Sequence, residues 1–411
     1  MYDTIRYHVI PPAFVVFFTG VVQYLAWSGR GASVDFSALW GNEFAWRFLG
    51  VSFAWAYVSL LVPSRKCKGP VTDFGQVPEY QDNGTLYYWA TLVTFVLYNF
   101  FVDKDLSLKI YDNFPQILGA LNTCALLLCV VLLIKGRLSP DVREKTVMKK
   151  FPIAYEFYSG KELHPRLLGV DVKQFTNCRF GMVAWQIFIL AFFFAGIKRE
   201  GFNYGFAVNV LLQSIYVAKF WWWESGYFWT LDVALDRAGY YLCWGCLVWV
   251  PVLYTFSSYF MVAHPPLTSP LISLLIFFVG LSAVIINYAV DREKEIFRKT
   301  GGECEIRGEP AKYIDVEYVD EKKRLRKSKL LISGFWGTLR HLNYNFEILA
   351  AFSWSCVGWH HGLAPFYYVV FLTGLLVHRV FRDEEKCRRK YGKYWEKYCS
   401  IVRYRMIPYV F

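Results

Sequence analysis

Two cations close to the end of a long apolar run could bind an anion. Lys294 and Arg298 follow the apolar run 267–290 and are four residues apart. If the segment 291–299 continues that run as a helix, both side chains lie on one helical face. Two cations on one face form a clamp that suits a phosphate group. The alternative is an ordinary basic stretch that contacts water or anionic lipid head groups.

A glycine-flanked aromatic pair lies before the next apolar run. Gly334 and Gly337 flank Phe335 and Trp336. The glycines would let the backbone approach a planar ligand that the rings cover, or the rings could simply anchor the chain at the membrane interface. Asn343 follows, and its amide could recognise a carboxamide such as that of nicotinamide, because it both donates and accepts hydrogen bonds. Asparagine also joins membrane helices to one another, so a packing role is the alternative.

A third polar group closes the last apolar run. Arg379 and Asp383 are four residues apart, so they can pair on one helical face. Such a pair could orient a ribose or a pyrophosphate, or it could be a structural salt bridge at the interface. Tyr391 and Tyr398 lie on a predicted amphipathic helix beyond it, which could rest on the membrane surface.

Carboxylates and aromatic residues also gather earlier in the chain. Tyr216 and Glu224 mark the exit from one apolar run, and Asp232 and Asp236 precede the next. Carboxyl groups surrounded by aromatic residues tend to have a raised pKa, which is typical of groups that handle protons. This acidic loop also breaks the basic pattern of its side of the membrane, so we expect it to have a purpose beyond topology.

Sequence motifs for binding metals or nucleotides are weak or missing. Cys243 and Cys246 form a C-x-x-C pair inside an apolar run, where free cysteine packs as a small hydrophobic residue. His360 and His361 have no carboxylate or cysteine nearby in sequence, so we expect no metal site. The sequence has neither a P-loop nor a G-x-G-x-x-G after a strand, so a nucleotide would bind in another manner.

The elements that position these residues are apolar enough to be embedded in a membrane. The chain has 411 residues, of which 55% are apolar and 20% are aromatic, whereas a soluble protein carries more charge. Runs of about 20 nearly uncharged residues predict transmembrane helices. We therefore expect an all-α, polytopic integral membrane protein with about ten transmembrane helices. The runs are 8–28, 44–63, 86–102, 115–134, 180–197, 203–223, 238–262, 267–290, 339–357 and 363–381.

Basic residues are unevenly distributed between the predicted loops. Most of the 45 Lys and Arg residues lie in the loops after the second, fourth and eighth runs and in the C-terminal tail. Basic residues gather on the cytosolic side, so this pattern places both termini in the cytosol. It also accounts for the net charge of +12 without nucleic acid as a partner, and leaves membrane lipids as the expected surroundings.

The runs and loops suggest two functional halves. Residues 1–178 hold the first four helices and a basic cytosolic loop. Residues 179–411 hold helices five to ten, the loop 291–329 and the tail, and we expect the cofactor pocket in this half. The loop 291–329 could form a compact cap, and the alternation over 313–318 predicts a strand in it.

Long segments of the sequence resemble the sterol reductase family. The C-terminal segments 331–344 and 391–399, with the Arg379 and Asp383 cluster between them, resemble the family's signature. Other segments are similar to the Δ7-sterol reductase branch of the family, especially its plant form. They are 68–70, 165–166, 175–182, 236–240 and 243–251. One departure is Asn343-Tyr344-Asn345-Phe346-Glu347, where the plant-like branch has His-Tyr-x-Pro-Glu.

The resemblance implies an enzyme with ten membrane helices that reduces a sterol carbon–carbon double bond with NADPH. The implied bond is the Δ7 bond of a 5,7-diene sterol. NADPH would arrive from the cytosol and the sterol from the bilayer. Lys294 and Arg298 would hold the 2′-phosphate side. The full set of implied cofactor contacts is Lys294, Arg298, Leu331, Trp336, Asn343, Tyr344, Arg379, Asp383 and Tyr391.

A ring double bond has no carbonyl to accept a hydride, so an acid must first protonate it. The hydride then reduces the resulting cation. A pocket of low polarity would keep a carboxyl or phenol protonated until it is needed. The candidate acids are Tyr216, Glu224, Asp232, Asp236 and Tyr398.

Three other functions stay open at the level of sequence. The reduced bond could be Δ14 or a side-chain bond such as Δ24. Isoprenylcysteine-type methyltransferases have a related short C-terminal module that binds S-adenosylmethionine, although they do not share the upstream resemblance. A non-catalytic membrane scaffold is the third. The membrane would be the endoplasmic reticulum in a eukaryote and the inner membrane in a bacterium.

Overall fold

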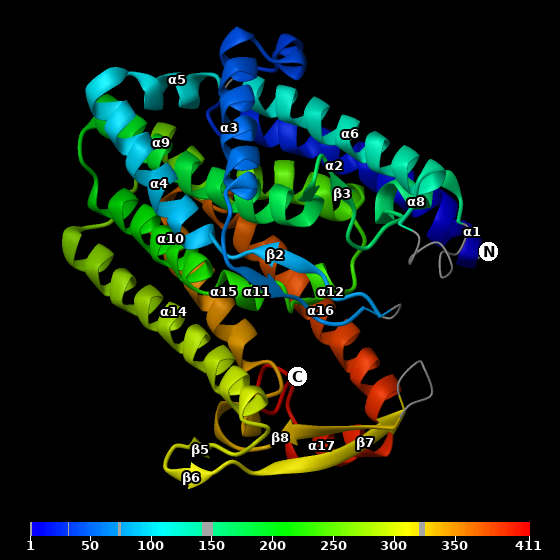
Figure 1. Ribbon diagram of the computed structural model, residues 1–411. Coiled ribbons are helices and arrows are strands. Elements are labelled where there is room, and N and C mark those ends of the chain that lie inside the picture. The colour runs from blue at the N-terminus through cyan, green and yellow to red at the C-terminus, as the bar shows by residue number, and fades with distance from the viewer. Residues whose placement is uncertain (1, 32, 73–74, 142–150, 320–324) are drawn as a thin grey trace. The chain divides into compact units, whose positions relative to one another are not determined.

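The computed structural model describes the chain except residues 1, 32, 73–74, 142–150 and 320–324 (Figure 1). It divides into two compact units. Unit 1 is Met1–Leu267 with His360–Pro365, and unit 2 is Thr268–Trp359 with Phe366–Phe411. This division falls later in the chain than the boundary at residue 178, which was drawn from topology and expected chemistry.

Unit 1 is a helical bundle. Its core contains large aromatic rings, such as Phe114 and Tyr259, whose centroids lie 4.6 Å apart. Two short antiparallel hairpins, β1–β2 (Lys66–Lys68 with Glu79–Gln81) and β3–β4 (Arg166–Leu167 with Val170–Asp171), interrupt it. Its helices are α1 (Tyr2–Thr4), α2 (Ile10–Ser28), α3 (Glu43–Leu61), α4 (Gly84–Leu97), α5 (Leu106–Asp112), α6 (Phe114–Leu138), α8 (Ile153–Ser159), α9 (Met182–Glu200), α10 (Tyr204–Trp222), α11 (Glu224–Tyr227), α12 (Leu231–Ala234) and α13 (Phe256–Ala263).

Several of these helices begin or continue as π-helix. The segment Gln174–Gly181 leads into α9, and the segment Tyr240–Tyr254 leads into α13. Pro251 lies inside the second segment, where its missing N–H and its ring disturb the ordinary α-helical hydrogen bonds. Gly181 allows the first segment to approach the second closely, because a side-chain carbon there would collide with the backbone oxygen of Cys246.

Unit 2 contains fewer helices and a longer hairpin. Its helices are α14 (Pro270–Lys299), α15 (Leu342–Cys356), α16 (Tyr367–Tyr391) and α17 (Lys393–Ile401). Strands β5 (Glu305–Ile306) and β6 (Glu309–Pro310) pair first, and β7 (Tyr313–Val319) then pairs with β8 (Leu325–Leu331). Trp395 and Tyr398 of α17 pack on Ile314 and Val316 of β7, so the amphipathic helix lies against the hairpin (Figure 1).

Within the described part of the chain, eight helical segments are long and apolar enough to cross a membrane, so the chain is a multi-pass membrane protein. The other two predicted spans correspond to α10 and α15. Helix α15 has 15 residues, fewer than the roughly 20 that a perpendicular crossing needs. The eight segments are Ile5–Ser28, Phe36–Leu61, Gly84–Val102, Phe114–Leu138, Gln174–Glu200, Tyr240–Ala263, Pro270–Lys299 and Ala364–Tyr391.

Two local predictions for the loop 291–329 are confirmed. Helix α14 continues without a break to Lys299, and the alternating segment forms β7. Its partner β8 was not predicted, because Leu325-Arg-Lys-Ser-Lys-Leu-Leu331 combines a charged half and an apolar half instead of alternating.

Candidate functional site

All nine residues implied as cofactor contacts lie in unit 2. They come from the last turns of α14, the end of β8, the 3-10 helix Gly334–Gly337, the first turn of α15 and the second half of α16. Leu331 and Trp336 belong to one apolar cluster with Val290 of α14. Tyr391 belongs to the neighbouring cluster under the hairpin, beside Trp395. Three of the nine predicted contacts therefore belong to two apolar clusters of unit 2.

Lys294 and Arg298 have different surroundings, although they share a helical face. The Lys294 ammonium lies 3.5 Å from the centroid of the Trp336 ring. The indole N–H of Trp336 donates to the backbone oxygen of Val290 at 2.9 Å, which fixes the ring in place. Arg298, one turn later, is exposed. An aromatic face stabilises a cation that has lost water, so Lys294 is held inside the unit while Arg298 faces outward.

Gly334 and Gly337 are required by close packing of the backbone. Gly334 has φ +64°, and a side-chain carbon there would collide with the carboxylate of Glu293. That carboxylate accepts the backbone N–H of Phe335 at 2.8 Å. A side-chain carbon at Gly337 would lie 2.6 Å from the backbone oxygen of Ile332. The glycines thus fix the turn that presents Trp336, which explains them without a ligand.

Two buried side-chain atoms at the N-terminal end of α15 have no hydrogen-bond partner among the described residues. The Asn343 amide nitrogen donates to the Asp291 carboxylate at 2.9 Å, but its amide oxygen has no hydrogen-bond partner among the described residues. The Nε2 atom of His341 is in the same state, and the side chain is only 5% exposed. A buried polar atom without a partner costs about 1–3 kcal/mol, so such atoms suit a ligand that supplies the missing hydrogen bonds.

The His341 ring also connects Asn343 with the remaining residues. It stacks on Tyr344, with ring centroids 5.1 Å apart and an interplanar angle of 17°. The charges of Asp383 and Lys294 both act on His341. Three elements, α14, α15 and α16, therefore direct polar groups to the same place. His341 lies in the segment 331–344 that resembles the family, but it was not among the implied cofactor contacts, and its burial could not be foreseen from the sequence.

A buried ion cluster holds this turn in position. Glu384 is 5% exposed, and its carboxylate lies 2.9 Å from Arg340 and 2.8 Å from Arg405. The backbone N–H groups of Arg340 and His341 donate to the backbone oxygens of Tyr404 and Arg405 at 3.1 and 2.9 Å. The segment after α17 is thus fastened to the start of α15. Glu384 directly follows Asp383, so the cluster also fixes the position of that carboxylate.

Tyr398 is the one acid candidate in unit 2. Its side chain is 6% exposed, and its hydroxyl donates to the backbone oxygen of Trp336 at a long 3.4 Å. Burial raises the pKa of the phenol well above its ordinary value, so the group keeps its proton at neutral pH.

The other four acid candidates lie in unit 1, and Glu224 is tightly paired there. Its carboxylate forms an ion pair with Arg179, whose side chain is fully buried. Arg179 also donates to the side-chain oxygen of Asn83 at 2.8 Å. Burial raises the pKa of the Glu224 carboxyl, and the charge of Arg179 acts in the opposite direction. This arrangement is typical of a structural ion pair.

Asp232, Asp236 and Tyr216 have other surroundings in unit 1. The ammonium of Lys173, which is 1% exposed, donates to the backbone oxygens of Asp232 and Asp236 and to that of Val233 at 2.8 Å. The buried ammonium of Lys173 therefore holds the backbone of the acidic loop. The Tyr216 ring has the ammonium of Lys219 4.6 Å from its centroid.

Comparison with known proteins shows the family of the whole chain. The model of the ergosterol biosynthesis ERG4/ERG24 family matches residues 13–411. The chain belongs to this sterol reductase family. It is 38% identical to a 7-dehydrocholesterol reductase of Arabidopsis thaliana over 370 residues, which cover 89% of this chain and 85% of that protein. It is 35% identical to a 7-dehydrocholesterol reductase of Danio rerio over 84% of this chain and 72% of that protein.

A viral relative covers even more of the chain. A probable 7-dehydrocholesterol reductase of Acanthamoeba polyphaga mimivirus is 30% identical over 402 residues, which are 92% of this chain and 86% of that protein. The predicted resemblance to sterol reductases is thus confirmed, and membership of the family implies an oxidoreductase.

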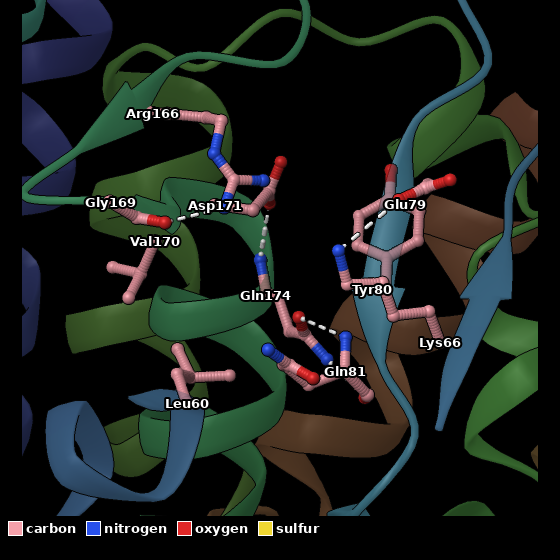
Figure 2. A pocket seen from close by; sticks show the side chains of 10 residues that line it. All are labelled: Leu60, Lys66, Glu79, Tyr80, Gln81, Arg166, Gly169, Val170, Asp171 and Gln174. Atoms are coloured by element: carbon pink, nitrogen blue, oxygen red, sulfur yellow. Dashed lines mark hydrogen bonds and ion pairs between the residues drawn. The ribbon is translucent and has the colours of Figure 1, made fainter. Parts of the chain in front are cut away.

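This sterol reductase also has a cavity that the sequence did not predict. It measures about 270 Å³ and lies in unit 1 between the end of α3 and the two short hairpins (Figure 2). We call it the hairpin cavity. Its residues are spread from position 60 to position 174, so no local motif marks them. They are Leu60, Lys66, Glu79, Tyr80, Gln81, Arg166, Gly169, Val170, Asp171 and Gln174.

Proposed function

We propose that this sterol reductase uses NADPH to reduce the Δ7 double bond of a 5,7-diene sterol. The relatives named as 7-dehydrocholesterol reductases support the choice of bond, because they cover most of the chain. The observation that carries the choice of cofactor is the buried amide oxygen of Asn343, which accepts no hydrogen bond from the described residues.

The polar atoms of unit 2 fit a nicotinamide cofactor. The carboxamide of nicotinamide offers an N–H to the Asn343 oxygen, and its oxygen can accept a hydrogen bond from His341 when the neutral ring carries its hydrogen on Nε2. Lys294 and Arg298 would hold the 2′-phosphate. Leu331, Trp336, Tyr344 and Tyr391 would line the rest of the cofactor, and Arg379 with Asp383 would orient its sugar and pyrophosphate. When bound, NADPH supplies a hydride.

The chain itself must supply a proton to one carbon of the double bond, so that the hydride can reach the other. Tyr398 is the acid that the surroundings favour, because its phenol is buried, protonated and adjacent to Trp336. Its long hydrogen bond to a carbonyl is easily given up when a substrate accepts the proton instead. Tyr216, Asp232 and Asp236 remain alternatives, and Glu224 is the weakest because of its pair with Arg179.

We further propose that both termini face the cytosol, with the Lys294 end of α14 on that side. The distribution of basic residues supports this orientation. NADPH would then reach unit 2 from the cytosol, while the sterol enters from the bilayer. In a eukaryotic cell the membrane would be that of the endoplasmic reticulum, and in a bacterium the inner membrane.

The test is the reaction itself. Membranes containing the full chain are incubated with NADPH deuterated at the hydride position and with one sterol at a time, unsaturated at Δ7, Δ14 or Δ24. We expect mass spectrometry to find one deuterium in the reduced Δ7 product alone. Reduction only of the Δ14 or Δ24 bond would contradict the proposed substrate. Transfer of a methyl group from S-adenosylmethionine, or no reaction, would contradict the proposed activity.

A further inference from the structure

The hairpin cavity has a polar rim and a closed floor. Its floor is formed by buried side chains, among them Tyr80, Asp171 and Gln174. Both ends of the Gln174 amide are bonded to the backbone of Gln81, at 3.1 and 2.8 Å, so the floor is rigid. The exposed side chains of Lys66, Glu79 and Arg166 also line the cavity, with Arg166 on one side and Lys66 and Glu79 on the other (Figure 2).

The charges around the cavity are balanced. Lys66 and Arg166 contribute two cations, and Glu79 and Asp171 contribute two carboxylates. Lys66 lies 3.4 Å from Glu79, and both side chains are exposed, so this ion pair is weak and can open. Asp171 is 5% exposed and lies opposite Arg166 in the hairpin register. Two charges of each sign within one cavity suit a ligand that itself carries both signs.

Helix α3 has an exposed apolar stripe on one side and contributes a buried leucine to the cavity on the opposite side. Val51, Trp55 and Val58 are 71%, 42% and 52% exposed, and their spacing places them on one side of the helix. Leu60, in the last turn of α3, lines the cavity. Because α3 belongs to a candidate membrane span, this stripe faces lipid and the cavity lies where the span ends, at the depth of the lipid head groups.

The turn between β3 and β4 carries a further apolar side chain beside the rim. Leu168 is 84% exposed and has φ +48°, an unusual conformation for a residue other than glycine. Its backbone oxygen accepts a hydrogen bond from the Tyr57 hydroxyl of α3 at 3.0 Å. This contact holds Leu168 at the level of the last turns of the span, where moving its exposed side chain from water into lipid is favourable.

From these observations we propose that the hairpin cavity binds the head group of one phosphatidylethanolamine molecule. Arg166 and Lys66 hold the phosphate, Asp171 and Glu79 accept hydrogen bonds from the primary ammonium, and an acyl chain passes the exposed side chain of Leu168, which is next to Gly169 of the lining. The negative head group of an anionic lipid would be repelled by both carboxylates. A choline head group has no N–H to donate and needs open aromatic faces, whereas the face of Tyr80, the only aromatic ring in the lining, is stacked on Phe228 at 4.1 Å.

The test uses the purified full chain and a count of retained lipid by native mass spectrometry. The protein is exchanged into vesicles of equal parts phosphatidylethanolamine, phosphatidylcholine and phosphatidylglycerol, and then released into mild detergent. We expect one retained phosphatidylethanolamine, preferred over phosphatidylcholine by about tenfold, the value of one charge-assisted hydrogen bond. Equal retention of the two lipids, or preference for phosphatidylglycerol, would overturn the proposal.

Variants separate the two halves of the site. Arg166→Gln should lower retention of both lipids, because it removes a phosphate contact. Asp171→Asn and, independently, Glu79→Gln should lower only the preference for ethanolamine over choline. Glu79 is exposed, so its variant is informative even if Asp171→Asn fails to fold. Lys68→Gln is the matched control, because Lys68 is an exposed cation on β1 outside the lining and should change nothing.

A last arm distinguishes a lipid from a soluble ligand. O-phosphoethanolamine carries the same head-group charges without acyl chains, so it should displace the retained lipid only at far higher concentration. Displacement at a concentration comparable to that of the lipid would contradict the lipid assignment. So would full retention by the Arg166→Gln variant.

Discussion

Unit 1 and unit 2 each bury an ion cluster, but the surroundings of the two clusters differ. In unit 1, Glu224 pairs with Arg179, and the arginine also donates to Asn83, so the charges satisfy one another. In unit 2, Glu384 is paired as completely, with Arg340 and Arg405. Beside this second cluster, however, His341 and Asn343 present buried atoms without partners among the described residues. At the unit 1 cluster the open atoms are the N–H donors of Arg179 and Trp221, whereas unit 2 also offers an open amide oxygen. Buried charge alone therefore does not mark a site, and the combination of an open acceptor with an open ring nitrogen is what suits a carboxamide.

The largest effect that this contrast predicts is on the folding of unit 1. Glu224→Gln leaves the fully buried Arg179 without its counter-ion and should lower the free energy of unfolding by about 3–5 kcal/mol. Thermal unfolding of the detergent-solubilised protein, followed by size-exclusion chromatography, measures this loss. The exposed Glu200→Gln is the control. If Glu224→Gln were as stable as the parent but unable to reduce sterol, Glu224 would be the acid and the contrast would fail.

In unit 2 the largest predicted effect is on turnover without loss of folding. Asp383→Ala or Arg379→Gln should lower sterol reduction by at least about 100-fold, because a misplaced cofactor reacts poorly. The protein should still insert and elute as a folded species. Exposed Lys386→Gln, one turn along α16, serves as the control. Normal NADPH-dependent reduction by both variants would remove this cluster from the site.

The role of Tyr398 gives a prediction of similar size on kcat alone. Tyr398→Phe loses one weak 3.4 Å hydrogen bond, so stability and NADPH affinity should be nearly unchanged. Loss of a general acid should lower kcat by about 100-fold. Because burial raises the pKa of this phenol, it stays protonated below that pKa, and the parent rate should not fall through loss of this proton between about pH 7 and about pH 9. An unchanged kcat in the variant would shift the choice to Tyr216, Asp232 or Asp236.

A smaller effect concerns the open amide oxygen. Asn343→Ala should raise the Kd for NADPH about tenfold, the equivalent of one buried hydrogen bond. Binding is measured by titration of nucleotide fluorescence, without sterol. The 3-acetylpyridine analogue of NADPH lacks the amide hydrogens, so the same variant should bind it as the parent does. Equal weakening for both nucleotides would mean that Asn343 acts through packing alone.

The smallest effect is expected at the exposed end of the clamp. Arg298→Gln should weaken NADPH binding only about fivefold or less, because its side chain faces solvent. The effect should shrink as salt is added, and NADH, which has no 2′-phosphate, should be unaffected. A loss for NADH of the same size would show that Arg298 does not recognise this phosphate.

The helices could be predicted from the sequence more completely than their contacts. Apolar runs determine where a chain can cross a membrane, so helices such as α9 and α14 lie where the pattern places them. Ion pairs between residues that are far apart in the sequence follow no such local rule. Arg179 pairs with Glu224, and Arg340 pairs with Glu384, because tertiary packing brings them together. The short hairpins were missed because strands of two or three residues, such as β3 and β4, are too brief for alternation to be visible.

For the candidate site, the family resemblance indicated which residues belong to it, and the structure showed their burial, contacts and hydrogen-bond partners. Lys294 and Trp336 were both expected to contact a cofactor, but the cation–π contact between them, with the ammonium 3.5 Å from the ring centroid, was not expected. His341 lies within the segment that resembles the family, but the resemblance assigned it no role, because a lone histidine has many possible roles. Its burial and open nitrogen depend on the segment after α17, which the sequence describes only as basic and aromatic.

That segment also has a consequence for biosynthesis. Arg340 reaches the backbone of Val402, 62 residues further along the chain. A ribosome therefore delivers α15 to the membrane before the groups that will hold its first turn have been made. Until those groups emerge, Arg340 must remain in water or associate with other partners. The candidate site in unit 2 is thus completed among the last steps of synthesis, so a cofactor bound there would stabilise the finished protein without assisting the insertion of its helices.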